Sequence, residues 1–246
     1  HYLDESAVCG SNYTLYLVKE PGDDSSKQLA YVQRNRKKGH SYFLDTQGWI
    51  PVSIYGGNDT AAAIDEKGGI HIIPNSIVST PDLSTTIKYL PYNNLAISVA
   101  FQEDFIIALS SSNAVYETEL DNTDEFFDFV DDLEGIDIRT ISGKFEHCIA
   151  VSMDGCVYTR GENKDGRLGT GNRKRSDTFV QVMTLRNVNI VDASAGDFHS
   201  LFINSDGKVY SCGFNGFGED LSNNSQTGTI TTPRGTSVLS GARFCI

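Results

Sequence analysis

The chain has 246 residues, of which 39% are hydrophobic, and a formal net charge of −12 at pH 7. It is long enough for one or two buried cores, and no apolar run reaches the roughly eighteen residues of a transmembrane helix. The acidic charge argues against a surface for nucleic acid or anionic membrane, because phosphate binding requires clustered lysines and arginines.

Five cysteines are scattered along the chain without a C-x-x-C pair. An odd number of separated cysteines is typical of reduced thiols, so we expect a cytoplasmic or nuclear protein. No spacing of cysteine and histidine matches a zinc site, and no motif calls for a metal or an organic cofactor. The N-terminal residues show no signal-peptide pattern.

The first half of the chain contains three units of strand, turn and strand, over residues 9–33, 55–73 and 99–117. Their apolar residues alternate with a period of two, which favours β-strands. The first unit has a long polar hairpin loop, the second has glycines at its turn, and the third has lost them. We expect repeats to begin near positions 10, 57 and 100.

Residues 117–138 form an acidic segment that also carries phenylalanines. One interpretation is a solvated connection whose aromatic rings cover the edge of a sheet. The other is a loop that docks a basic partner through Asp124, Glu125, Phe126 and Phe127, with charge steering the approach. Hydrolysis by paired carboxylates is disfavoured, because no spacing places two of these acids across a common cleft.

The second half contains two clear copies of one unit, because residues 142–166 align with residues 195–218 at an offset of 52. The residues that coincide are His147 with His199, Asp154-Gly155 with Asp206-Gly207, Val157-Tyr158 with Val209-Tyr210, Gly161 with Gly213, and Asn163 with Asn215. Asp-Gly between two alternating runs is typical of a tight hairpin. A further copy opens near position 241. Repeats of 40 to 50 residues that contain only strands predict the blades of a propeller.

This order of residues resembles the repeat of the RCC1-like (regulator of chromosome condensation 1) family. The residues that carry the resemblance are Gly143, His147, Asp154, Gly155, Val157, Tyr158, Gly161, Asn163, Gly166, Leu168 and Gly169 in one copy, and Gly196, His199, Asp206, Gly207, Val209, Tyr210, Gly213, Asn215 and Gly218 in the other. The match is tight over residues 138–221 and loose over residues 5–120. Thr159 and Ser211 stand where the family has tryptophan.

The resemblance implies an all-β fold, a β-propeller of four-stranded blades of which the family ring has seven. About five to six blades are recognisable here, in a single domain over residues 1–246. A closed ring of seven such repeats needs more than about 300 residues. We therefore expect an incomplete propeller whose remaining blades are missing from this sequence.

The stretch GENKDGRLGTG at residues 161–171 is predicted to be an interblade loop. A phosphate-binding loop would need G-x-x-x-x-G-K-[ST] ahead of a helix, and Lys164 is followed by aspartate. We expect glycines here to allow tight turns, and Asn163 to hydrogen-bond its own backbone.

Candidate binding residues lie in the predicted loops at the rims of the ring. His147 and His199 precede the second strand of their repeats, where each imidazole either pins a turn or, as the resemblance implies, faces a docked GTPase. Other repeats have Thr60, Phe105 and Phe244 at this place. Basic clusters at residues 34–38 and at Arg173, Lys174 and Arg175 are either solvated or contact acidic protein or phosphate.

These observations favour a non-catalytic protein–protein interaction propeller that binds a protein partner through rim loops. The alternative is a guanine-nucleotide exchange factor for a Ran-like small GTPase, which shifts a population of states and needs no nucleophile. A third hypothesis is an extracellular binder built on the same ring. Neither nucleic acid nor membrane is an expected partner.

Overall fold

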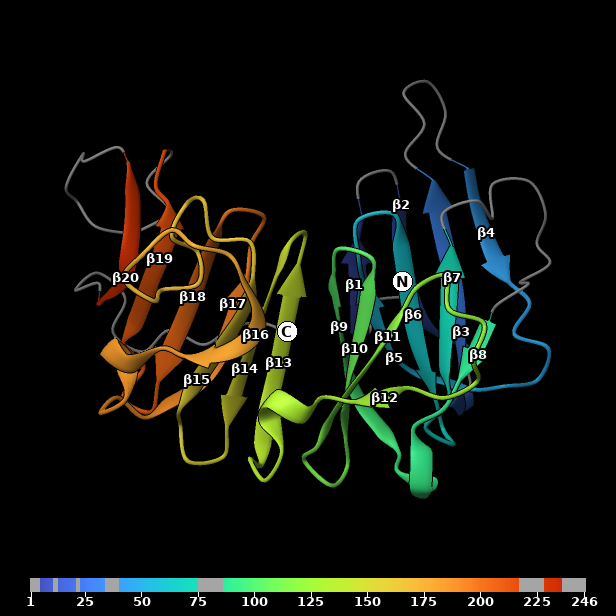
Figure 1. Ribbon diagram of the computed structural model, residues 1–246. Helices are drawn as coiled ribbons and strands as arrows, with labels where there is room; N and C mark the ends of the chain where they lie inside the picture. The colour runs from blue at the N-terminus through green and yellow to red at the C-terminus, as the bar shows by residue number, and fades with distance from the viewer. Residues whose placement is uncertain are drawn as a thin grey trace.

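The computed structural model describes residues 5–10, 13–20, 23–33, 40–74, 86–216 and 228–235. These residues form five four-stranded antiparallel sheets, and in each sheet the strands follow one another in chain order. We call the sheets blades 1 to 5 and the strands of each blade A to D. The prediction of an all-β propeller with four-stranded blades is confirmed (Figure 1).

The strands of blades 1 to 3 are β1 (Glu5–Cys9), β2 (Tyr13–Glu20), β3 (Asp23–Gln33), β4 (His40–Leu44), β5 (Pro51–Gly56), β6 (Thr60–Asp65), β7 (Ile70–Pro74), β8 (Thr86–Lys88), β9 (Ala96–Gln102), β10 (Phe105–Ser110), β11 (Val115–Glu119) and β12 (Asp128–Phe129). Those of blades 4 and 5 are β13 (Ile138–Lys144), β14 (His147–Ser152), β15 (Val157–Gly161), β16 (Ser176–Gln181), β17 (Ile190–Ala195), β18 (His199–Asn204), β19 (Val209–Phe214) and β20 (Thr229–Gly235). Three single-turn 3₁₀ helices, η1 (Pro91–Asn93), η2 (Asp131–Leu133) and η3 (Met183–Leu185), lie in links between blades. No helix in the described ranges is long and apolar enough to cross a membrane.

In blades 2 to 5, the side chain of the last residue of strand B accepts hydrogen bonds from backbone amides of the B–C hairpin. In blade 2, Asp65 Oδ1 accepts hydrogen bonds from the amides of Lys67 and Gly69, both at 2.8 Å. In blade 5, Asn204 Oδ1 accepts from the amide of Lys208 at 2.8 Å. Ser110 and Ser152 do the same in blades 3 and 4. A short polar side chain at this position satisfies turn amides that would otherwise lack partners.

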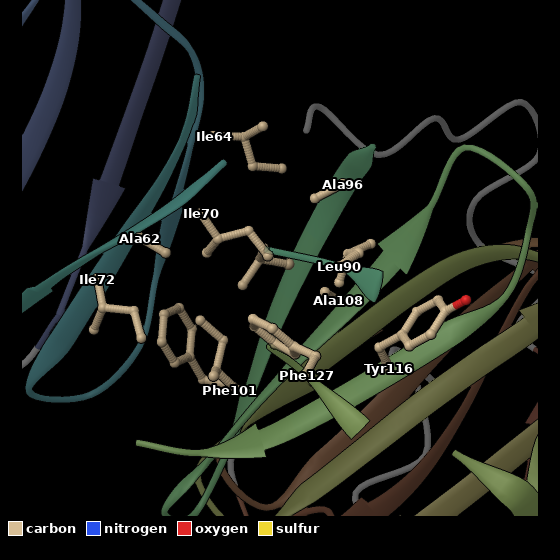
Figure 2. Close-up of a cluster of buried hydrophobic side chains, with 12 residues drawn as sticks. Ala62, Ile64, Ile70, Ile72, Leu90, Ala96, Phe101, Ala108, Tyr116 and Phe127 are labelled. Carbon is tan, nitrogen blue, oxygen red and sulfur yellow. The ribbon is translucent and has the colours of Figure 1, made fainter. Parts of the chain in front are cut away.

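Neighbouring blades pack face to face through apolar layers. Figure 2 shows the layer between blades 2 and 3, where Ile64 and Ile70 lie opposite Phe101 and Phe127. Similar clusters fill the other three interfaces between the five blades. Each fully buried Ile or Phe contributes about 1.5–3 kcal/mol, so these layers hold the blades in order.

The A strands lie innermost and contact one another along the inside of the arc (Figure 1). They line a central cavity of about 600 Å³. Its wall includes Val8, Tyr55, Ile97, Ser142 and Asp192, one residue from the A strand of each blade. With A inside, the loops at the two ends of each sheet form the two rims of the propeller.

Candidate functional site: the A–B rim

One rim is formed where strand A turns into strand B and where strand C leads toward strand D. The strand register shows this in blade 4, because His147 at the start of β14 pairs with both Lys144 at the end of β13 and Gly161 at the end of β15. We call this end the A–B rim and the opposite end the B–C rim. All candidate binding residues within the described ranges come from loops or strand ends of blades 3, 4 and 5.

The loop at residues 162–175 joins β15 to β16, and a buried asparagine holds it together. Asn163 Oδ1 accepts from the amide of Leu168 at 3.0 Å, and its Nδ2 donates to the carbonyl of Asn172 at 3.0 Å. Thr159, at the place of the family's tryptophan, donates its hydroxyl to the carbonyl of Leu168 at 2.9 Å. Asn163 therefore closes the loop on itself, and Thr159 fastens it to its own blade.

The predicted turn residues divide into two classes. Positive φ angles occur at Gly155, Gly161, Gly166, Gly169, Gly207 and Gly213. At Gly143 and Gly196 the reason for glycine is a close approach. A Cβ on Gly143 would lie 2.5 Å from the carbonyl oxygen of Phe101 in the neighbouring blade, and one on Gly196 would lie 2.5 Å from the ring of His199. Asp154 and Asp206 occupy the hairpin turns. Asn215 is buried, and its backbone N–H donates to the carbonyl of Gly228 at 2.8 Å.

Arg167 ties this loop to blade 5, although no sequence pattern pointed to it. Its side chain is buried, its Nη1 donates to the carbonyl of Asp197 at 2.8 Å, and its Nη2 donates to Asp165 Oδ2 at 2.7 Å. The guanidinium also lies 5.0 Å from the ring centre of Phe198, a cation–π contact. Its partner Asp197 is 30 residues away, so only the folded arrangement brings the two groups together.

His147 is fully buried at the same junction. Its Nε2 lies 2.9 Å from Ser200 Oγ, and Ser200 donates its own hydroxyl hydrogen to the carbonyl of Arg167 at 2.7 Å. Because that hydrogen is used, His147 Nε2 must be the donor to Ser200. Burial, together with the charge of Arg167, lowers the pKa of His147 to about 3. His147 is therefore a neutral interblade contact.

His199 has a different environment, although it is the repeat partner of His147. It is half-buried, and its ring lies against Gly196 in its own blade. The equivalent position in blade 1 is Tyr13, whose hydroxyl donates to the carbonyl of Thr60 in blade 2 at 2.8 Å. The first residue of strand B thus joins two blades in blades 1 and 4, and His199 is the more accessible of the two histidines.

The pKa of His147 predicts a loss of stability in acid. The unfolded chain binds a proton near pH 6.5, whereas the folded chain does so only near pH 3, so this stabilisation is complete above pH 6.5 and is lost as the pH falls toward 3. For this one group, the free energy of unfolding changes by at most about 1.4 kcal/mol per pH unit. Urea unfolding from pH 7 to 4.5 should show that the free energy of unfolding depends less steeply on pH in His147→Asn than in the parent protein. Parallel curves for the two proteins would contradict the buried neutral imidazole.

An aromatic row of two exposed rings and the half-buried Phe214 crosses the rim from blade 4 to blade 5. The rings of Phe145 and Phe198 are 5.8 Å apart, and those of Phe198 and Phe214 are 6.5 Å apart, both edge to face. Phe145 and Phe198 are 40% and 44% exposed. Phe145 also has a positive φ of 55°, an unfavourable conformation for a bulky side chain. No sequence pattern points to these phenylalanines, because their separation along the chain hides the row.

The basic cluster at residues 173–175 lies on the same rim. Arg175 forms a two-fold ion pair with Glu103 of blade 3, at 2.6 and 3.1 Å, and a third contact to Asp177 at 2.7 Å. Arg173 donates to the hydroxyl of Thr229 in blade 5. Lys174 is exposed. The other basic cluster, at residues 34–38, lies outside the described residues.

The acidic segment, which follows strand C of blade 3, is hydrogen-bonded to blade 2. The Nζ of the buried Lys88 donates to the carbonyls of Asn122 at 2.8 Å and Asp124 at 2.6 Å. Phe127 is buried in the layer of Figure 2, whereas Phe126 is 51% exposed. Asp124 and Glu125 are exposed. Of the four candidate residues in this segment, three reach the surface and Phe127 packs between blades.

Within the part of the chain that the structure describes, no three His, Cys, Asp or Glu side chains gather as metal ligands would. Cys148 is buried, and desolvation raises the pKa of its thiol to about 12, which leaves it protonated and unreactive at neutral pH. Cys212 is also buried, and its pKa is raised for the same reason.

Comparison with known proteins agrees with the blade geometry. The model of the regulator of chromosome condensation (RCC1) repeat matches residues 154–203, and a second model of this repeat matches residues 190–219. The human E3 ubiquitin-protein ligase HERC2 is 40% identical over 73 residues, which are 30% of this chain and 2% of that protein. The ultraviolet-B receptor UVR8 of Arabidopsis thaliana is 33% identical over 86 residues, or 35% of this chain and 20% of the receptor.

Solved structures extend the likeness to nearly the whole chain. Human WBSCR16 superposes with a TM-score of 0.73 at 15% identity, covering 96% of this chain and 67% of that one. Yeast RCC1 (Prp20), in its complex with Kap60, gives a TM-score of 0.69 at 15% identity, covering 94% of this chain and 60% of the yeast protein. At this identity the likeness concerns the fold. Residues 154–219 are thus RCC1 repeats, and the chain folds as consecutive blades of an RCC1-like β-propeller.

Proposed function

We propose that this chain is a non-catalytic protein-interaction propeller and that it binds its partner through the A–B rim. The observation that carries this proposal is the row of Phe145, Phe198 and Phe214 across two blades, in which Phe145 and Phe198 are exposed and Phe214 is half-buried. Protein interfaces are enriched in aromatic residues, and a few such anchors supply most of the binding energy. Among the described residues of this rim, the row is the feature suited to that role.

The 162–175 loop beside the row is held in place before any partner arrives, and it is fastened to the A–B turn that carries Phe198. Asn163 closes the 162–175 loop, Arg167 fastens it to Asp197, and His147 contacts Ser200 across the interface. A surface whose shape is already fixed loses little conformational entropy on binding. These buried polar groups therefore have a structural task, which supports a binding role in preference to catalysis by the histidines.

An exchange factor for a small GTPase is the second candidate. It is favoured by one comparison, since a solved structure of Prp20p from Saccharomyces cerevisiae, described with its binding properties to Gsp1p and histones, superposes with a TM-score of 0.69. The identity is 15%. Release of a fluorescent guanine nucleotide from a panel of Ran-related GTPases separates the two functions. We expect no acceleration of nucleotide release. Acceleration with any member of the panel would mean that the protein is an exchange factor and would overturn the proposal of a non-catalytic interaction module.

The binding surface itself is tested by photo-crosslinking in cells that express the protein. A benzoylphenylalanine replaces Phe198 on the A–B rim and, in the control, Tyr92 on the B–C rim, where the tyrosine is 92% exposed. We expect a discrete adduct from position 198 that is absent from position 92 and that disappears when Phe145 is also changed to Ala. Adducts from position 92 alone would place the partner on the opposite rim and overturn the proposal.

A further inference from the structure

The aromatic row carries a second feature, because each exposed phenylalanine has an acidic neighbour in its A–B turn. Phe145 is followed by Glu146, and Phe198 is preceded by Asp197. Asp197 is exposed, and the side chain of Glu146 is 37% exposed while its Oε2 lies 3.6 Å from Arg167 Nη1. Two turns of neighbouring blades thus present the same pair of groups, an aromatic ring and a carboxylate.

The protein already uses this pair to hold arginine, and it does so twice. Arg167 lies 5.0 Å from the ring centre of Phe198 and forms an ion pair with Asp165 at 2.7 Å. In the interface of blades 3 and 4, the buried Arg160 lies 4.8 Å from the ring centre of Phe179 and forms an ion pair with Glu117. A planar guanidinium can stack on a ring while its N–H groups reach a carboxylate, and an ammonium cannot do both as well.

The charge around the row agrees with a cationic ligand. Glu146, Asp165 and Asp197 surround it, and Arg167 is buried with both of its Nη atoms already engaged. Lys144 and Lys164 are nearby exposed bases, and Lys164 is paired with Glu162 at 3.0 Å. The net charge of the chain is −12. A basic segment would therefore be attracted both by the whole molecule and by the local carboxylates.

We propose that the row of Phe145, Phe198 and Phe214, with Glu146 and Asp197, binds arginine side chains of an extended basic segment in the partner protein. This inference rests on the proposed function, because it names the chemistry of the partner at the same rim. Arginine is selected over lysine, since stacking on the exposed rings adds to the attraction between charges. Phe145 and Phe198 are the specificity-determining residues, and the two carboxylates supply the charge.

The test measures fluorescence anisotropy with three labelled Gly-Ser peptides that carry four arginines, four lysines or four citrullines. We expect the arginine peptide to bind three- to tenfold more tightly than the lysine peptide, and the citrulline peptide to show no binding. The double variant Phe145→Leu with Phe198→Leu keeps apolar volume but removes two π faces, which at about 0.5–1 kcal/mol each is a five- to thirtyfold loss. Asp197→Asn should weaken the arginine peptide two- to fivefold, and the loss should shrink at high salt.

Tyr92→Leu on the B–C rim is the matched control and should leave all three affinities unchanged. Thermal unfolding checks that the double variant keeps its fold, which we expect because both rings are more than a third exposed. Equal binding of the arginine and lysine peptides, unchanged by the double variant, would overturn the arginine specificity. If the adduct from position 198 still forms in that case, the proposed interaction function stands and only the arginine specificity is wrong. If the adduct is also missing, both the arginine specificity and the proposed interaction function are wrong.

Discussion

Gly161→Ala is expected to destabilise the protein by more than about 4 kcal/mol, or to prevent stable folding. Gly161 ends β15 with a φ of +115°, and a Cβ there would lie 2.1 Å from the carbonyl oxygen of Glu146 and 2.8 Å from the Cα of His147. Both obstacles are backbone atoms of the neighbouring strand turn, so no side-chain rotation relieves them. Either blade 4 loses the register of β14 with β15 or the A–B turn must move. The measurement is urea unfolding of the purified variant beside the parent.

Gly171→Ala is the matched control, from the loop that follows Gly161 and with a positive φ as well. Its φ is +82°, but an added Cβ would meet only Thr232 Cγ2, at an ordinary 3.6 Å. The Gly171→Ala variant should therefore lose only the cost of a left-handed backbone conformation, about 1–2 kcal/mol of stability. Equal losses for the two variants would mean that backbone conformation alone, and not the close approach to Glu146, requires glycine at position 161.

His147→Ala is expected to lower the free energy of unfolding by about 3 kcal/mol. The substitution leaves a cavity between blades 4 and 5 and removes the hydrogen bond from Nε2 to Ser200 Oγ at 2.9 Å. The repeat partner serves as the control. His199 is half-buried and lies on Gly196, so His199→Ala should cost less than about 1 kcal/mol.

The variants His147→Ala and His199→Ala also distinguish a structural role of a histidine from a role in partner binding. His147→Ala should weaken binding only in proportion to the loss of folded protein, because the imidazole is buried. His199→Ala should change binding without a comparable change in stability, if His199 belongs to the contact surface. A stable His147→Ala protein that fails to form the adduct from position 198 would contradict the structural role given to His147.

The blades and their hairpins could be predicted from the sequence, because they depend on local patterns. A period of two defines strands such as His199–Asn204, and Asp206-Gly207 defines the turn that follows. The repeat offset of 52 then aligns the B and C strands of two blades. The side chains that cap the hairpins, such as Asp65 and Ser110, are local as well, and comparing the last residue of strand B across repeats would have found them.

The contacts between blades could not be predicted in this way. Lys88 is a charged residue in a short strand, and nothing in the sequence indicates that its Nζ is buried against the carbonyls of Asn122 and Asp124. The difference between His147 and His199 is equally hidden, because both occupy the same position of the repeat. It arises from what the next blade supplies, which for His147 is the hydroxyl of Ser200.

By itself, the sequence of this protein determined strand, turn and repeat, since each follows from the conformational preferences of neighbouring residues. Only the tertiary structure decided which residues meet across blades and which stay exposed. Phe145 joins Phe198 and Phe214 in one row because neighbouring repeats stack side by side, which brings the A–B turns of blades 4 and 5 to a ring-centre distance of 5.8 Å. Phe198 and Phe214 belong to the same blade and lie 6.5 Å apart. The candidate site is a product of that stacking, and no local pattern encodes it.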